Sequence, residues 1–277
     1  MTPRKLDFQD HRRDLGTNRY VYAVVSRRAG GLSIGVNMNP DKVCNFACPY
    51  CQVDRTVPGG PAEIDVAELD AELRHLLTLV ADGTLWDTAP FNTAAPEHRR
   101  VVDIAFAGDG EPTSPSEFPR AAAAARVARD QLAPGVPLRL LTNATLLHRG
   151  AVQAALAEFD DLWCKLDAGT DAWFHRVDAT RFPFSRVLRN LKELAAKRPI
   201  VIQAMFCSLG EDRPGPDEIA AWTGRLRHIA RQGRIAEVQV YTVARKPADS
   251  SVGALSPEEL ESIATAARTA GLNARAV

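Results

Sequence analysis

The chain has 277 residues, of which 45% are hydrophobic and 25% are charged, values typical of a globular protein rather than a disordered or fibrous one. Its 34 Lys and Arg residues balance its 34 Asp and Glu residues, so the formal net charge is +0 at pH 7. This balance argues against a protein whose main partner is nucleic acid or an anionic membrane.

The first thirty residues contain no continuous apolar segment and carry several basic residues, which argues against a secretory signal peptide. The longest apolar run, 200–209, is about half of the ~20 residues that a helix needs to cross a bilayer. We therefore expect a cytoplasmic protein that does not enter a membrane.

Short runs rich in β-branched residues alternate along the chain with amphipathic runs of helical period. The expected strands are, in chain order, 32–39, 101–107, 138–142, 161–166, 200–206 and 237–243. The expected helices are 64–82, 117–132, 151–159, 184–197, 217–232 and a last one that begins at Ser256.

Six strand–helix alternations predict an α/β fold with parallel strands and helices outside them, because a parallel connection needs a long crossover. A complete barrel of this type has eight such units, so six predict a partial (β/α)6 barrel. We expect an N-terminal extension at 1–31 and one domain at 32–277, which includes the C-terminal helix. The segment 86–100 shows no periodicity and is expected to be irregular.

Three of the five cysteines, Cys44, Cys48 and Cys51, lie within eight residues directly after the first expected strand. Clustered thiols suit a metal site in a reducing compartment better than disulfides, and soft thiolates select zinc, copper(I) or an iron–sulfur cluster. The next cysteine, Cys164, lies more than a hundred residues further on. Three ligands would leave one metal position open, as in catalytic metal sites. Cys164 and Cys207 are expected in the core.

The CxxxCxxC spacing, with Tyr50 directly before the last cysteine, resembles the signature of the radical S-adenosylmethionine (radical SAM) superfamily. The run 108–113 (GDGEPT) resembles the Gly-Gly-Glu motif of that family, and Thr142-Asn143 resembles the Thr-Asn that often ends its third strand. Together with 37–55 and 165–169, these segments look most like poorly characterised bacterial and archaeal relatives of the tRNA wyosine-base synthases.

This resemblance implies that Cys44, Cys48 and Cys51 bind three irons of a [4Fe-4S] cluster, and that S-adenosylmethionine chelates the fourth. Reductive cleavage of that cofactor would give a 5'-deoxyadenosyl radical, which abstracts hydrogen from a small or medium-sized substrate. A reductant such as flavodoxin or ferredoxin would supply the electron. The cluster would make the protein oxygen-sensitive.

The resemblance also implies which residues contact S-adenosylmethionine. They are Tyr50, Gly108, Asp109, Gly110, Glu111, Asn143 and Asp167. Tyr50 is expected near the adenine, and the turn 108–111 at the methionine ammonium, with Asp109 or Glu111 as acceptor. Each motif follows an expected strand, and the carboxyl ends of parallel strands are where such folds bind ligands.

Lys165 lies within an otherwise apolar expected strand, where a lysine is costly unless it faces a polar cavity or a partner. Lys165 and Asp167 are therefore candidate catalytic residues. One interpretation is a Schiff base with substrate, since a lysine is thought to engage pyruvate in the wyosine synthases. The other is an ion pair of Lys165 with Asp167 or Glu111.

Our first hypothesis is a radical SAM enzyme with an unidentified substrate. The alternatives are tRNA base modification of wyosine-synthase type, activation of a glycyl radical in a partner protein, and a non-catalytic iron–sulfur electron carrier. Wyosine formation is disfavoured, and nucleic acid is not a favoured partner, because no cysteine precedes Cys44 for a second cluster and no long basic extension is present. An electron carrier is disfavoured because it needs a fourth ligand and has no use for 108–113.

Overall fold

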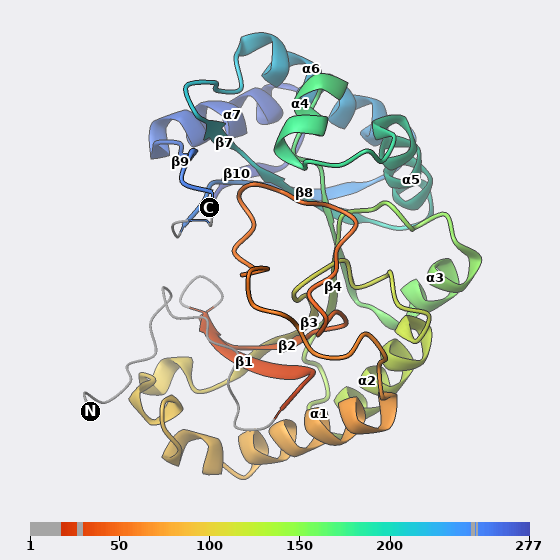
Figure 1. The fold of residues 1–277 in the computed structure, drawn as a ribbon, viewed down its shortest axis with the longest axis vertical. Helices are drawn as coiled ribbons and strands as arrows, with labels where there is room; N and C mark the ends of the chain where they lie inside the picture. Colours follow the sequence, from red (N-terminus) through yellow and green to blue (C-terminus); the bar gives the residue numbers. More distant parts are fainter. Residues whose placement is uncertain (1–17, 27–29, 245–246, 248) are drawn as a thin grey trace. The chain divides into compact units, whose positions relative to one another are not determined.

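The computed structural model describes residues 18–26, 30–244, 247 and 249–277 (Figure 1). Of the N-terminal extension expected at 1–31, residues 1–17 and 27–29 lie outside the described part. The main sheet has eight strands in the order β1-β2-β3-β4-β5-β6-β8-β10, with β1 and β10 as its two edges. It is an open, mostly parallel sheet accompanied by helices, so the predicted fold class of an α/β partial barrel is confirmed.

The strands of the main sheet are β1 (Val21–Ser26), β2 (Gly31–Val36), β3 (Val101–Phe106), β4 (Leu138–Thr142), β5 (Asp161–Lys165), β6 (Ile200–Met205), β8 (Ile235–Tyr241) and β10 (Ala274–Ala276). A separate antiparallel pair consists of β7 (Cys207–Leu209) and β9 (Val252–Ala254).

The α-helices are α1 (Val66–Ala81), α2 (Phe118–Leu132), α3 (Gly150–Ala155), α4 (Asp171–Val177), α5 (Phe184–Lys197), α6 (Pro216–Ala230) and α7 (Pro257–Thr269). The short 3-10 helices are η1 (Thr84–Asp87), η2 (Phe91–Thr93), η3 (Pro96–His98) and η4 (Leu156–Glu158). None of the helices formed by the described residues combines the length and the apolar character needed to span a bilayer.

The six expected strands correspond to β2, β3, β4, β5, β6 and β8, and the six expected helices to α1, α2, α3, α5, α6 and α7. The structure adds β1, which pairs antiparallel with β2, and the short β7, β9, β10 and α4. The segment 86–100 was expected to be irregular, but it contains the short helices η2 and η3. The strands β7, β9 and β10 and the helices η2 and η3 have three residues each, too few for a period of 2 or 3.6 to be visible in the sequence.

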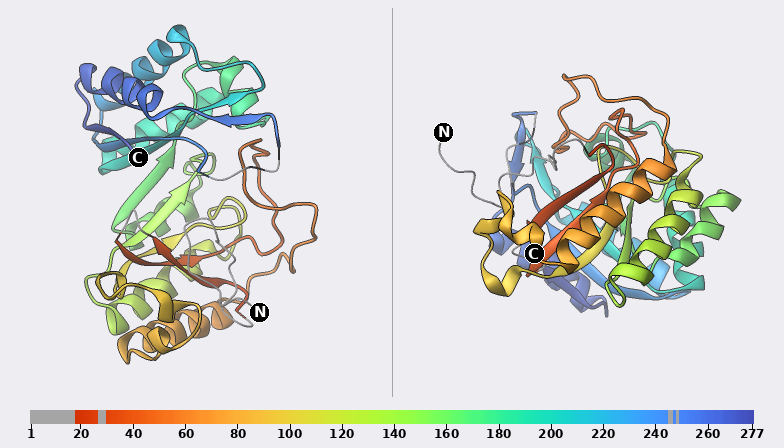
Figure 2. Two further views of the ribbon diagram at one scale, coloured as in Figure 1. Left: turned by 90° about the vertical axis from the view of Figure 1, so that its left-hand side faces the viewer. Right: turned by 90° about the horizontal axis from the view of Figure 1, so that it is seen from below.

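The described residues divide into two compact units. Unit 1 comprises the described residues up to Val43 together with Gly59–Leu140 and Ala151–Asp161. In this unit β2 is parallel to β3 and β3 to β4, and α1 and α2 lie side by side (Figure 2). Its core includes three aromatic rings: Phe106 and Phe118 pack edge to face at 6.1 Å, and Phe159 contacts both.

Unit 2 comprises Cys44–Pro58, Leu141–Gly150 and Leu162–Val277. Its strands β5, β6, β8 and β10 are parallel, and α5, α6 and α7 lie along one side of them (Figure 1). Side chains alternate between the faces of a strand, so one face carries fully buried residues such as Cys164. The other carries a polar row in which Lys165 is the register partner of Gln203, and Gln203 of Gln239. Cys164 and Cys207 are both 0% exposed, which confirms their core location.

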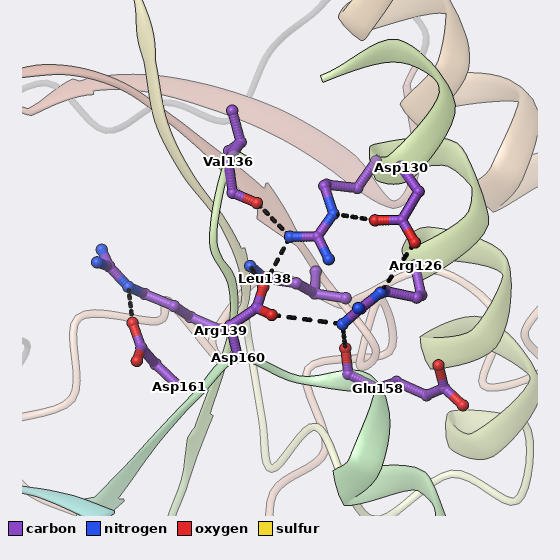
Figure 3. Close-up of polar contacts among 9 residues, drawn as sticks. Arg126, Asp130, Val136, Leu138, Arg139, Glu158, Asp160 and Asp161 are labelled. Atoms are coloured by element: carbon purple, nitrogen blue, oxygen red, sulfur yellow. Dashed lines mark hydrogen bonds and ion pairs between the residues drawn. The ribbon is translucent and has the colours of Figure 1, made fainter. Parts of the chain in front are cut away.

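A charged network links α2 to the start of β4 in unit 1 (Figure 3). Asp160 accepts hydrogen bonds from the Leu138 backbone N–H and from Nη1 of Arg129, both at 2.7 Å. Arg129 is buried and also pairs with Asp130 at 2.6 Å. Burial alone would raise the pKa of Asp160, but the hydrogen bonds from Leu138 and Arg129 lower it below its usual value. The carboxylate of Asp160 thus stabilises unit 1 in its charged form.

We predict that Asp160→Asn lowers the free energy of unfolding by about 1–2 kcal/mol at pH 7, an amount reduced by the partial exposure of Asp160. Because the folded-state pKa of this carboxyl is lowered, its contribution is present above about pH 4 and is lost as the pH falls through the folded value. Urea unfolding at several pH values measures both effects. Asp87→Asn, at an exposed position, is the control, and equal stabilities of D160N and wild type at pH 7 would contradict the prediction.

Candidate functional site

The loop that holds the three clustered cysteines follows β2 along the chain and belongs to unit 2. Cys44, Cys48 and Cys51 are partly exposed, whereas the two remaining cysteines are buried. The backbone N–H of Phe46 donates to Sγ of Cys44 at 3.5 Å, and Nη1 of Arg55 donates to Sγ of Cys51 at 3.1 Å. Two of the sulfur atoms therefore already face hydrogen-bond donors, as metal-bound thiolates do.

Among the described residues, no three His, Cys, Asp or Glu side chains converge closely enough to hold a metal ion. The chemistry of the loop nevertheless fits a cluster with three cysteine ligands, because the thiols lie on one short segment and N–H donors point at two of the sulfurs. Burial raises the pKa of the Cys48 thiol well above its usual value. A metal would have to displace that proton on binding.

The carboxylate of Asp167, which follows β5, is the centre of a buried polar network. It is 1% exposed, and its Oδ1 accepts from the Met205 backbone N–H at 2.8 Å. Its Oδ2 accepts from the Tyr50 hydroxyl at 2.5 Å and lies 3.0 Å from Nζ of Lys165. Since Tyr50 lies between Cys48 and Cys51, these bonds fix the cysteine loop to β5 and β6.

A second carboxyl group, that of Asp178 directly after α4, lies 3.1 Å from the Tyr50 hydroxyl and 3.6 Å from Sγ of Cys48. Its backbone carbonyl also accepts from the Ala47 N–H at 3.3 Å. Burial, followed by repulsion from Asp167, raises the pKa of Asp178 well above its usual value. The protonated form of Asp178 is therefore favoured beside the charge of Asp167.

Lys165 pairs with Asp167 and also donates to the Tyr241 hydroxyl at 3.0 Å. Its Nζ lies 5.0 Å from the ring centre of Tyr50 and 5.5 Å from that of Tyr241. Burial alone would lower the pKa of Lys165, but the charge of Asp167 outweighs it and the pKa is raised well above its usual value. Of the two ion pairs expected for Lys165, with Asp167 or with Glu111, the structure contains the pair with Asp167. This pairing favours the protonated amine.

Asn143, at the end of β4, is joined to the cysteine loop. Its Nδ2 donates to Oδ1 of Asn45 at 2.7 Å, and its Oδ1 accepts from the Thr145 hydroxyl at 2.6 Å. Asn45 donates in turn to the Thr145 hydroxyl at 2.7 Å. Because Asn45 directly follows Cys44, this triangle positions the first cysteine.

In unit 1, the turn 108–111 packs tightly against the end of β2. Oδ1 of Asn37 accepts from the Asp109 backbone N–H at 3.0 Å, and Nδ2 of Asn37 donates to Oδ2 of Asp109 at 2.7 Å. A Cβ on Gly108 would lie 2.2 Å from Oδ1 of Asn37, so only glycine permits this approach. Glu111 is 2% exposed and accepts from the Thr113 hydroxyl at 2.5 Å. Both acidic side chains of the turn are therefore held in place.

The structure places the candidate residues in two groups. Unit 2 holds the cysteines with Tyr50, Asn143, Lys165 and Asp167, and unit 1 holds the turn 108–111. The residues that sequence reasoning missed are Asn37, Asn45, Arg55, Asp178 and Tyr241. The first three lie in or near the cysteine motif, where a search for polar neighbours could have found them. Asp178 and Tyr241 carry no comparable local signal.

No protein-family model matches the chain. Its fold is that of radical SAM enzymes of known structure. A radical SAM methyltransferase from Sphaerobacter thermophilus matches with a TM-score of 0.62 and 14% identity over 93% of this chain and 68% of that one. Streptococcus suis SuiB bound to its precursor peptide SuiA matches with a TM-score of 0.60 and 14% identity over 88% of this chain and 48% of that one. SuiB has also been solved bound to S-adenosylmethionine.

Among curated sequences, a UPF0026 protein of Helicobacter pylori is 26% identical over 241 residues, which are 87% of this chain and 71% of that protein. A Brachyspira hyodysenteriae protein named GTPase Obg is 24% identical over 255 residues, 89% of this chain but 33% of that protein. The chain therefore spans about a third of this second relative. It contains no G-x-x-x-x-G-K-[ST] sequence, the phosphate-binding loop of many GTPases.

We predict that Gly110→Ala destabilises the protein by about 1–3 kcal/mol, because the added Cβ would lie 2.2 Å from the backbone carbonyl oxygen of Val43. Gly224→Ala is the matched control: that glycine lies within α6 with no heavy atom within 4 Å of the added Cβ, so alanine should stabilise by roughly 0.5–1 kcal/mol. Urea unfolding compares the two. A G110A protein as stable as wild type would contradict the tight packing of the turn.

We also predict that Tyr50→Phe costs roughly 1–3 kcal/mol, because it removes one buried hydroxyl that donates to Asp167 at 2.5 Å and lies 3.1 Å from Asp178. Tyr22→Phe removes one hydroxyl that donates to the Ala107 carbonyl at 3.0 Å, and should cost about 0.5–1.5 kcal/mol. Chemical unfolding of both variants gives the comparison. A Y50F protein more stable than Y22F would contradict the proposed contribution of the Tyr50 hydroxyl to stability.

Proposed function

We propose that this chain is a radical SAM enzyme whose cluster is held by Cys44, Cys48 and Cys51. When bound, the [4Fe-4S] cluster and S-adenosylmethionine would supply a 5'-deoxyadenosyl radical that abstracts hydrogen from a small or medium-sized substrate. The observation that carries the proposal is the cysteine loop: three partly exposed thiols at CxxxCxxC spacing, tied through Tyr50 to a buried carboxylate. The likeness of the fold to radical SAM enzymes supports it.

The protein's own contribution would begin with preorganisation of the loop. Tyr50 is bonded to Asp167 and Asp178, and Asn45 to Asn143, so the loop is held on both sides of Cys48 before any cofactor arrives. The Tyr50 side chain is 8% exposed. A ligand loop that its neighbours already orient needs little rearrangement when a metal binds.

The turn 108–111 would bind the methionine portion of S-adenosylmethionine, with Asp109 or Glu111 accepting from its ammonium group. Asn37 already orients the Asp109 carboxylate, and Thr113 orients that of Glu111. Carboxylates held in this way need little reorganisation when a cation binds. The absence of a side chain at Gly108 permits the close approach of the turn to Asn37.

Lys165 would act as an ammonium group rather than as a Schiff-base nucleophile, because its pairing with Asp167 keeps it protonated. An ammonium has three N–H donors, and the contacts with Asp167 and Tyr241 use two of them. We propose that the third donates to a carbonyl or anionic oxygen of the substrate. Asp167 would then position both Tyr50 and Lys165. A flavodoxin or a ferredoxin would supply the electron.

We predict that Cys48→Ala abolishes both cluster binding and the formation of 5'-deoxyadenosine. The protein is purified without oxygen, reconstituted with iron and sulfide, and assayed for 5'-deoxyadenosine with S-adenosylmethionine and dithionite. Cys207→Ala is the control, since this thiol is fully buried and its loss should leave the iron content unchanged. A C48A protein that still forms 5'-deoxyadenosine would refute the proposal. So would a wild-type chain that holds no iron–sulfur cluster.

A further inference from the structure

Arg55 contacts one of the proposed cluster ligands from outside the cysteine motif. It lies four residues after Cys51, and its Nη1 is 3.1 Å from the Cys51 sulfur. The side chain is exposed, so its contact with sulfur is not imposed by packing against a core. The guanidinium is permanently charged, so its effect does not depend on the titration of either group.

We propose that Arg55 is a positioning residue for the cluster, which raises the reduction potential of the cluster through its hydrogen bond to Cys51. This inference rests on the proposed function and goes beyond it. Reduction adds one electron to a cluster and places part of the new negative charge on its sulfur ligands. A cationic N–H donor stabilises that charge, and hydrogen bonds to sulfur are one of the means by which proteins set cluster potentials.

The other two cysteines have different surroundings. Cys44 accepts from a neutral backbone N–H, that of Phe46, and Cys48 lies beside the carboxyl group of Asp178. Arg55 places a full positive charge within hydrogen-bond distance of the Cys51 sulfur, so a cluster held there should be easier to reduce than one whose sulfurs meet neutral donors alone.

The test is the midpoint potential of the reconstituted cluster, followed by the electron paramagnetic resonance signal of its reduced form during anaerobic titration with dithionite. Arg55→Gln should shift the midpoint to a more negative value, so that the ratio of reduced to oxidised cluster at a fixed solution potential falls roughly two- to tenfold. Arg55→Lys, which keeps the charge, should give a smaller shift. Arg231→Gln makes the same charge change at an exposed position at the end of α6 and should leave the midpoint unchanged.

Iron and sulfide contents establish first that each variant is loaded. If loaded R55Q has the same midpoint as R231Q, the role of Arg55 is refuted while the proposed function stands. If R55Q takes up no cluster, the R55K protein decides: a midpoint more negative than that of wild type supports the role, and an equal one refutes it. A wild-type chain without a cluster would overturn both the proposed function and this inference.

Discussion

The buried carboxylate of Asp167 is the constraint on which the candidate site depends. A carboxylate that is 1% exposed is stable only if its oxygens are satisfied, and here a backbone N–H, a phenol and an ammonium satisfy them. One of these partners, Tyr50, belongs to the cysteine loop, and another, Lys165, ends β5. The buried charge of Asp167 therefore holds the cysteine loop against strands that lie more than a hundred residues further along the sequence.

The same requirement explains the protonation pattern around the loop. Burial, followed by repulsion from Asp167, raises the pKa of Asp178, which favours its protonated form. Lys165, by contrast, keeps its charge because Asp167 balances it. The ion pair with Asp167 thus explains why a lysine is tolerated in an otherwise apolar strand. The hydrogen bond to the Tyr241 hydroxyl also orients the Lys165 ammonium group.

Much of this could be predicted from the sequence, and the reason for each success or failure is physical. Long amphipathic helices such as α5 and strands such as β4 show their period clearly, and the predicted bounds of both agree with the structure. The cysteines were identifiable because their spacing itself carries the chemistry. Asp178 was missed because its partner, Tyr50, lies 128 residues away and neither the spacing nor the composition links the two. Strand β10 was missed because it has only three residues, and β1, which has six, was missed because it lies in the segment expected to be an N-terminal extension.

The central claim is that Cys44, Cys48 and Cys51 hold a [4Fe-4S] cluster with one iron open to S-adenosylmethionine. Mössbauer spectroscopy of the protein reconstituted with iron-57 tests it most directly, with spectra recorded before and after S-adenosylmethionine is added. The account predicts the spectrum of a [4Fe-4S] cluster in which one iron site alone changes when S-adenosylmethionine binds. A spectrum that does not respond to S-adenosylmethionine, or a chain that binds zinc in place of iron, would contradict it.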